Sequence, residues 1–120
     1  MASTVDPSTT ESVLEHHLAA FGDQDMEEIL ADYTDESVVI TDTETYHGLE
    51  EIATLFEAFF AEFSQPHEFE MDHQAVEGDV AHIAWHAETV EQTYEHAVDT
   101  FVVRDGVIQT QTFAARTAPK

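Results

Sequence analysis

The carboxyl group of Asp99 is the side chain in this sequence best placed to do chemistry. It lies between Val98 and Phe101, within an alternating segment over 93–104 that predicts a β-strand. An ionised carboxylate in a central strand is costly unless it is paired or hydrogen-bonded. We therefore expect a raised pKa, which suits an acid or a hydrogen-bond donor. The alternative is a carboxylate that a neighbouring tyrosine or histidine satisfies and that has no chemical role.

His17 is the second candidate for chemistry. It follows Leu14 by three residues and precedes Phe21 by four, so it lies on the apolar stripe of a helix predicted over 11–22. A histidine in this position can donate a hydrogen bond or act as a base near neutral pH. The alternative is a histidine whose hydrogen bonds are purely structural.

The eight histidines do not form a metal-binding pattern. His82 and His86 are four residues apart, which separates them by about 13 Å on a strand. The sequence has no cysteine, no His-x-His pair and no HExxH helix, so we predict neither a metal site nor a cofactor. It also lacks the GxSxG, Walker and dinucleotide-binding patterns, which leaves nucleophilic hydrolysis and nucleotide chemistry without support.

The composition is strongly acidic, with 26 Asp and Glu residues against three Lys and Arg and a formal net charge of −23. Nucleic acids and anionic membranes are therefore poor partners, because binding them requires a basic face. A hydrophobic content of 42% with clear periodicity indicates a folded domain and not a disordered acidic segment. We interpret the acidic surface as halophilic, with binding of cationic partners as the alternative.

The ends of the chain carry no targeting or membrane signal that we can identify. The opening MASTVDPSTT lacks the basic and apolar regions of a secretory signal, and no apolar run approaches the roughly 20 residues of a membrane span. We expect a cytoplasmic protein. Its length predicts one domain over 11–116, with short tails over 1–10 and 117–120.

Helical patterns occupy the first half of the chain. After the helix over 11–22, Asp25 begins a shorter helix and SVVIT over 37–41 reads as a strand. A third helix over 46–63 carries a broad apolar stripe formed by Ile52, Leu55, Phe56, Phe59, Phe60 and Phe63. This many aromatic side chains indicate a helix laid over a concave surface that encloses a pocket.

The second half of the chain changes to the alternating period of strands. Segments over 67–76, 80–90, 93–104 and 107–115 are separated by turn residues, including Asp105–Gly106. Helices followed by antiparallel strands predict an α+β fold in which three N-terminal helices pack on the concave face of a curved, mainly antiparallel sheet.

The faces of the sheet follow from the hairpin between the second and third of these strands. If Glu91 and Gln92 form a two-residue loop, Val90 pairs with Thr93 and Asp99 lies opposite Ala84. Asp99 then shares its face with His82, His86 and Phe101, as a pocket with a polar floor would require. The opposite face carries Ile83 and Trp85, and we expect it to pack against a partner subunit.

Three segments together identify a family resemblance. LADYTDESVVIT, the YHGLEEI turn and the VDTFVVRDGVI hairpin resemble the SnoaL-like branch of the NTF2-like superfamily, which includes ketosteroid isomerases and polyketide cyclases. The resemblance covers 11–115. It implies a cone-shaped domain with a cavity between the sheet and the helices, and a homodimer.

The resemblance also implies roles for individual residues. Steroid isomerases have an aspartic acid at the position of Asp99, with phenylalanine two residues later as in Phe101, and a hydrogen-bonding tyrosine near the position of His17. Their aspartate base aligns with Thr41, one residue before Asp42, so Asp42 can supply the base only if a bulge re-aims it.

We therefore expect a small-molecule pocket protein, with a cofactor-free proton-transfer enzyme of the isomerase, cyclase or dehydratase type as the leading hypothesis. The catalytic candidates are Asp99, His17, Asp42 and His86. The expected contacts to an apolar, oxygen-bearing ligand are Tyr33, Phe56, Phe59, Phe60, His82, Phe101, Thr110 and Thr112. The alternatives are a non-catalytic ligand-binding module and a dimeric assembly or stress module.

Overall fold

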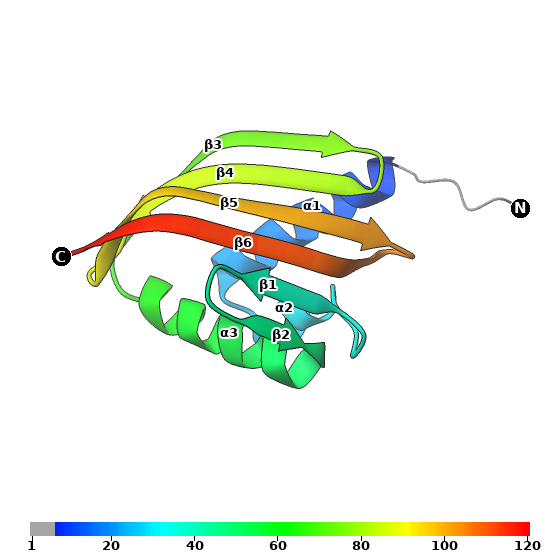
Figure 1. The fold of residues 1–120 in the computed structure, drawn as a ribbon, viewed down its shortest axis with the longest axis horizontal. Helices are drawn as coiled ribbons and strands as arrows, with labels where there is room; N and C mark the ends of the chain where they lie inside the picture. Colours follow the sequence, from blue (N-terminus) through cyan, green and yellow to red (C-terminus); the bar gives the residue numbers. More distant parts are fainter. Residues whose placement is uncertain (1–6) are drawn as a thin grey trace, which may run out of the picture.

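The computed structural model describes residues 7–120, which form three helices and six strands (Figure 1). The helices are α1 (Pro7–Asp23), α2 (Met26–Leu30) and α3 (Gly48–Phe63). The strands are β1 (Val38–Thr41), β2 (Thr45–His47), β3 (Glu68–Glu77), β4 (Val80–Glu88), β5 (Gln92–Arg104) and β6 (Val107–Pro119).

The strands form one curved sheet in the order β2-β1-β6-β5-β4-β3. All neighbouring pairs are antiparallel except β1 and β6, which run parallel. The long strands β3 to β6 arch over the helices, and α3 lies beneath their concave side (Figure 1). The predicted α+β architecture, with three helices against a curved, mainly antiparallel sheet, is confirmed.

Helix α1 begins earlier than the sequence predicts. It starts at Pro7, a residue favoured at the first helical position, so Thr10 lies inside the helix and not at its start. The Thr10 hydroxyl donates a 2.8 Å hydrogen bond to the carbonyl of Gly78, which fixes α1 to the β3–β4 turn. The predicted tail therefore ends before residue 7, and its first six residues lie outside the described part of the chain.

The connection into α3 contains a short strand, β2, that the polar sequence does not predict. It pairs with β1 through Val38 opposite His47 and Ile40 opposite Thr45. Gly48 follows with a φ of 80°, and a Cβ there would lie 3.0 Å from the carbonyl oxygen of Asp35. Glycine is therefore required where the chain turns from β2 into the helix.

The predicted register between β4 and β5 is wrong by one residue. The hairpin loop has four residues, because Glu88 pairs with Thr93, and Ile83 lies opposite Asp99 instead of Ala84. A bulge around Glu95 and His96 in β5 shifts the pairing of the two strands by one residue. A shift of one residue exchanges the two faces of β4 relative to β5.

A second bulge changes the face of β6. Val103 pairs with Ile108, but Val102 pairs with Thr110, so Gln109 is left over in β6. Without this extra residue Thr112 would lie opposite Asp99; with it, Phe113 does. At the other end, β6 continues to Pro119, which pairs with Gln92, so residues 117–119 are strand and not the predicted tail.

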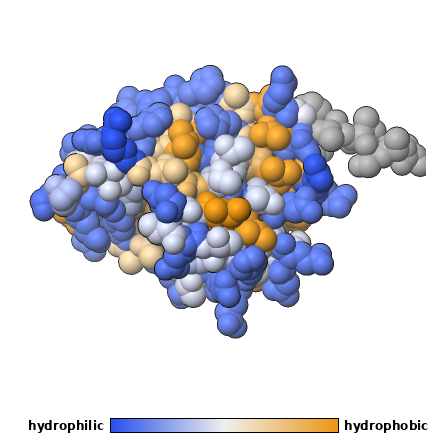
Figure 2. All heavy atoms as spheres, in the orientation of Figure 1, coloured by the Kyte–Doolittle hydropathy of each residue, from blue (hydrophilic) through white to orange (hydrophobic). Residues whose placement is uncertain are grey.

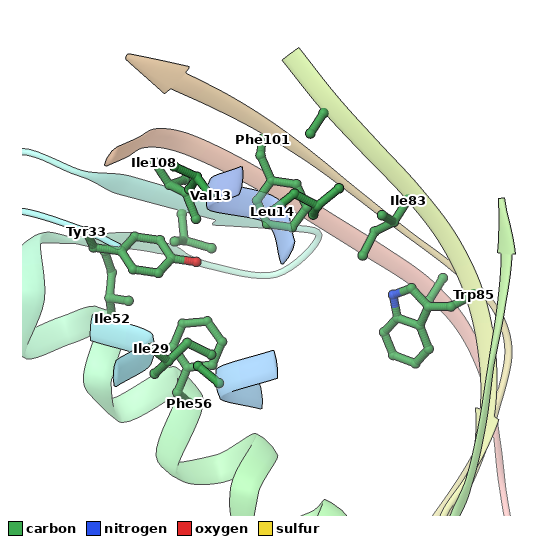
Figure 3. Close-up of a cluster of buried hydrophobic side chains, with 14 of the residues drawn as sticks. Val13, Leu14, Ile29, Tyr33, Ile52, Phe56, Ile83, Trp85, Phe101 and Ile108 are labelled. Carbon is green, nitrogen blue, oxygen red and sulfur yellow. The ribbon is translucent and has the colours of Figure 1, made fainter. Parts of the chain in front are cut away.

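The core lies between the concave face of the sheet and the helices. In Figure 3, Ile83 and Trp85 project from β4 into the interior, on the side of the helix that carries Phe56. Ile29, Ile52 and Phe101 are fully or almost fully buried in the same cluster. No helix in the described part of the chain is long and apolar enough to cross a membrane.

The middle of the outer face of the sheet carries no carboxylate although the protein is acidic. Two rows cross it from β3 to β6: Ala75, His82, Thr100 and Thr112, and His73, Ala84, Val98 and Ala114. Neither row contains a carboxylate. In Figure 2, orange and white atoms gather across the middle of the face on view, with blue atoms around them.

Candidate functional site

A cavity of about 390 Å³ opens between the inner face of the sheet and helices α1 and α3. Most of its wall is apolar, and much of it is aromatic. The lining residues are His17, Leu18, Phe21, Gly22, Gln24, Leu55, Phe56, Phe59, Phe63, His67, Phe69, Met71, Ile83, Trp85, Asp99, Gln111 and Phe113.

Asp99 lies in the wall of this cavity and is only 7% exposed. The indole Nε1 of Trp85 donates a 2.9 Å hydrogen bond to its Oδ1, and the amide Nε2 of Gln111 donates a 2.9 Å hydrogen bond to its Oδ2. Tyr33 donates its hydroxyl hydrogen to Oε1 of Gln111, which orients the Gln111 amide with its nitrogen toward Asp99. Both carboxylate oxygens are thus held by neutral donors.

The environment changes the acidity of Asp99. Burial raises the pKa of its carboxyl group from 3.8 to about 6, and the hydrogen bonds from Trp85 and Gln111 oppose that rise. The group is therefore mostly ionised at neutral pH but more basic than a surface aspartate. A base of this kind is suited to removing a proton in an apolar site.

His17 lines the same cavity from α1 and is 5% exposed. Its ring packs edge-on against Phe101, Phe56 and Tyr33, with centroid distances of 5.1, 5.9 and 6.1 Å. Burial lowers the pKa of the imidazole to about 4, so the ring is neutral near pH 7. Its Nδ1 is buried and has no hydrogen-bond partner among the residues that the structure describes.

A buried carboxylate, Glu62, fixes the end of α3 to the β4–β5 hairpin. It accepts hydrogen bonds from the hydroxyls of Tyr94 at 2.8 Å and Thr89 at 2.7 Å, and from the amide of Gln92. The Tyr94 ring in turn packs on the Trp85 ring at a centroid distance of 5.3 Å. This cluster supports the indole that holds Asp99.

The structure brings Asp99, His17, Phe56 and Phe59 together at the cavity. Tyr33, Phe60 and Phe101 lie close behind that wall. Phe60 packs against Phe21 and Phe56, Phe101 packs against His17, and Tyr33 contacts Gln111. These three residues support lining side chains instead of lining the cavity themselves.

Five predicted site residues lie away from the cavity. Asp42 is exposed in the turn between β1 and β2, so no bulge re-aims it inward. His82 and His86 point to the outer face because of the shifted β4–β5 register, and His82 bonds Thr100 at 3.0 Å. Thr110 and Thr112 point outward because of the extra residue in β6.

The same register shift removes the surface expected for a partner subunit. Ile83 and Trp85 are 4% and 7% exposed and line the cavity. They belong to the inner face and are not available for packing against a second chain.

Sequence reasoning missed Trp85 and Gln111 as groups of the site. Both carry a hydrogen-bond donor within a predicted strand, and such a donor needs a partner where it is buried. The donors are visible in the sequence. Their common partner, Asp99, is not, because the bulges in β5 and β6 change which residues lie opposite one another.

A separate cluster lies on the outer surface, where His86 meets two carboxylates. Its Nδ1 lies 2.8 Å from Oδ2 of Asp72, and its Nε2 lies 3.6 Å from Oε2 of Glu70. The hydrogen bond that His86 donates to the Asp72 carboxylate raises the pKa of the imidazole. Because all three side chains are well exposed to solvent, we interpret the cluster as a surface ion pair.

Comparisons with known proteins agree with the observed fold. A family model described as a SnoaL-like domain matches residues 14–110. Comparison with curated proteins finds no significant match. A Kribbella flavida structure, provisionally assigned as a ketosteroid isomerase, is 13% identical and covers 94% of this chain and 82% of its own, with a TM-score of 0.75.

Two further structures are similar to the same extent. An M. tuberculosis LEH-like epoxide hydrolase is 16% identical, with a TM-score of 0.72 and coverage of 91% of this chain and 84% of that one. An NTF2-like protein from Burkholderia xenovorans is 17% identical, with a TM-score of 0.72 and coverage of 93% and 92%. At these identities the likeness establishes the fold alone.

Proposed function

We propose that this chain, which belongs to the SnoaL-like domain family, binds a small apolar molecule with an oxygen function and transfers a proton within its cavity. The observation that carries the proposal is the carboxylate of Asp99, ionisable near neutral pH and set in a largely apolar wall. The cavity volume of about 390 Å³ is within the range of about 300–1,000 Å³ typical of small-molecule sites.

Asp99 acts as the base in this proposal. Its carboxylate removes a proton from a carbon next to a carbonyl group, and the electrons of the broken C–H bond form an enolate. The protonated Asp99 then returns the proton to another carbon of the same conjugated system, so that the reaction is an isomerisation with no net loss of atoms. A raised pKa favours the first step because it makes Asp99 a stronger base than a solvated aspartate.

His17 stabilises the enolate oxygen. Buried N–H groups without a partner are rarer than acceptors without one, so we place the single proton of the neutral ring on Nε2 and leave the buried Nδ1 unprotonated. The Nε2–H group is then free to donate a hydrogen bond to a ligand in the cavity. A fixed neutral donor in a water-poor site is an effective stabiliser of developing negative charge.

A non-catalytic binding module is the second candidate. The observation in its favour is that Asp42 lies outside the site, which leaves Asp99 as the one carboxylate among the described residues that line the cavity. The same carboxylate could instead activate water for attack on an epoxide, the substrate class named for the M. tuberculosis neighbour.

The test is turnover of a β,γ-unsaturated ketone, followed by the ultraviolet absorbance of the conjugated product, with an epoxide assayed in parallel. Asp99→Asn should lower kcat by about 10²–10⁴-fold. The matched control is Asp105→Asn, which removes one exposed carboxylate at the β5–β6 turn. Equal turnover by the wild type and Asp99→Asn would contradict the proposal, and ligand-induced stabilisation without turnover would favour the binding module.

We also infer that the protein works as a homodimer in a salt-rich cytoplasm. The outer face of the sheet, centred on Val98 and Thr100, is the place where two chains of such high negative charge meet with least repulsion. Light scattering in molar salt should show a dimer for the wild type and a monomer for Val98→Glu. A monomeric wild type would contradict the inference.

A further inference from the structure

We propose that the cavity selects hydrophobic organic cations, that is, protonated or quaternary amines with an alicyclic or aromatic body, over neutral and anionic molecules of the same shape. The inference concerns binding at the Asp99 cavity. It does not depend on the proposed proton transfer.

The first reason is that Asp99 has no cationic partner among residues 7–120, the part of the chain that the structure describes. Its two hydrogen-bond donors, Trp85 and Gln111, are both neutral. All three Lys and Arg residues of the chain lie in surface ion pairs: Arg104 with Asp79, Arg116 with Glu95 and Lys120 with Glu88. A buried carboxylate without a counter-charge gains from any cation that a ligand brings beside it.

The second reason is the neighbourhood of the carboxylate. The titratable groups that share the cavity with Asp99 are His17 on α1 and His67 between α3 and β3, and Tyr33 lies behind Gln111. His17 is neutral near pH 7 because burial lowers the pKa of its imidazole to about 4, so it is not a counter-ion for Asp99. His67 is exposed at the edge of the cavity, where its Nδ1 lies 3.0 Å from the carbonyl oxygen of Gln65.

The third reason is the aromatic wall. Trp85 stacks on Phe113 at a centroid distance of 6.1 Å and packs against Phe69 at 5.3 Å, and Phe59 meets Phe113 edge-on at 5.5 Å. Aromatic faces attract cations through their quadrupole, most strongly for tryptophan, and they also bury an apolar body. A single ligand can therefore place its ammonium group beside Asp99 and its carbon frame against these rings.

The charge of the whole protein acts in the same direction. With a formal net charge of −23, the surface concentrates cations and repels carboxylates and phosphates. This long-range contribution is screened by salt, whereas the contact with a buried carboxylate is screened much less. Salt concentration therefore separates a general attraction to the surface from selection by the cavity.

The experiment uses three ligands with one carbon frame: 1-adamantylammonium, 1-adamantanol and 1-adamantanecarboxylate. Their affinities for the full-length chain are measured by isothermal titration calorimetry at pH 8 in molar sodium chloride. We expect the ammonium ion to bind roughly tenfold more tightly than the alcohol, and the carboxylate to bind most weakly. Asp99→Asn should remove the preference for the ammonium ion and still bind the alcohol, which shows that the cavity is intact.

Asp105→Asn is the matched control and should keep the preference, because it removes an equal charge away from the cavity. Equal affinities for the ammonium ion and the alcohol in the wild type would overturn the proposal. So would a preference of the same size in Asp99→Asn, because it would then owe nothing to the buried carboxylate. Failure of ketone turnover would leave these affinities unchanged, so the two proposals fail separately.

Discussion

The indole nitrogen of Trp85 and the carboxylate of Asp99 meet at 2.9 Å across the β4–β5 pair, in the wall of an otherwise largely apolar cavity. The bond joins a group of the aromatic wall to the ionisable group of the site. It also depends on the register of two strands, since Ile83 and not Ala84 lies opposite Asp99.

The first prediction concerns this bond. Trp85→Phe keeps an aromatic ring but removes the donor, so the ionised form of Asp99 loses one of its two hydrogen bonds. We expect the pKa of Asp99 to rise further above 6, because a hydrogen bond to a charged group contributes about 1.5–3 kcal/mol. Carboxyl ¹³C NMR titration measures the change. An unchanged Asp99 titration in this variant would show that the indole does not stabilise the carboxylate.

The second prediction concerns the orientation of Gln111. Tyr33→Phe removes the donor that holds Oε1 of Gln111, so the amide is free to rotate and to present its oxygen to Asp99. We expect the Asp99 pKa to rise and the pH profile of turnover to shift to higher pH. Tyr46→Phe, on β2, is the matched control and should leave both unaltered. A Tyr33→Phe variant with lower stability but the wild-type pH profile would assign Tyr33 a purely structural role.

The third prediction is that Asp99→Asn is more stable than the wild type at pH 8. The folded-state pKa of about 6 exceeds the ordinary value of 3.8, so folding favours the protonated carboxyl group, and the ionised form costs stability as the pH rises from about 4 to above 6. The full cost is about 3 kcal/mol, and the asparagine amide, which faces two donors, offsets part of the gain. Urea denaturation should show a gain of at least about 1 kcal/mol at pH 8 and a smaller one at pH 5.

The result contradicting this prediction is a destabilised Asp99→Asn variant at pH 8. That outcome would mean that the ionised carboxylate stabilises the folded protein, and not that the protein retains it for function at a cost in stability. A stabilised but inactive variant would be the trade-off expected of a functional site.

The fold itself could be predicted from the sequence to a large extent. The apolar stripe of α3 and the alternation in β5 correctly place Phe56 and Asp99 on facing surfaces, because each period is a local property of the chain. The faces of β4 and β6 could not be predicted. Each face depends on one bulge, near Glu95 in β5 and at Gln109 in β6. A bulge cannot be seen in the sequence, because the residues on either side of it alternate as they do in a regular strand.

The site was therefore predicted in part. Asp99 was identified because a carboxylate between apolar neighbours in a strand is unusual. This inference does not depend on how the strands pair. Its partners Trp85 and Gln111 were missed because they can be identified only from the pairing of β5 with β4 and β6. The side chains of His82 and Thr112 were predicted to face the cavity because the two bulges were not foreseen. The structure places both on the outer face.

The fourth prediction concerns the contact between α1 and α2. The His16 ring lies 2.9 Å from oxygens of both Asp32 and Glu28, and the hydrogen bond that it donates to the Asp32 carboxylate is the main reason for its raised pKa. A raised folded-state pKa gives stability that is fully present below 6.5 and is lost as the pH rises through the folded value. His16→Gln should therefore destabilise the protein more at pH 6 than at pH 9. Equal losses at the two pH values would exclude a charged His16 at this contact.

The fifth prediction concerns salt. With a formal net charge of −23, repulsion within the folded chain is greatest in dilute buffer, and salt screens it. We expect Tm to rise between dilute buffer and molar potassium chloride, by about 3–6 °C for each 1 kcal/mol of relieved repulsion in a domain of this length. Molar sorbitol is the uncharged control. A Tm that does not change between the two salt conditions would contradict a halophilic surface.

The most direct test of the central claim is the titration of the Asp99 carboxyl carbon by NMR in the wild-type protein, assigned by comparison with Asp99→Asn. A carboxyl group buried in the largely apolar wall of the cavity should titrate near pH 6 and shift when 1-adamantylammonium is added. A titration near 3.8 that does not respond to 1-adamantylammonium would contradict the account.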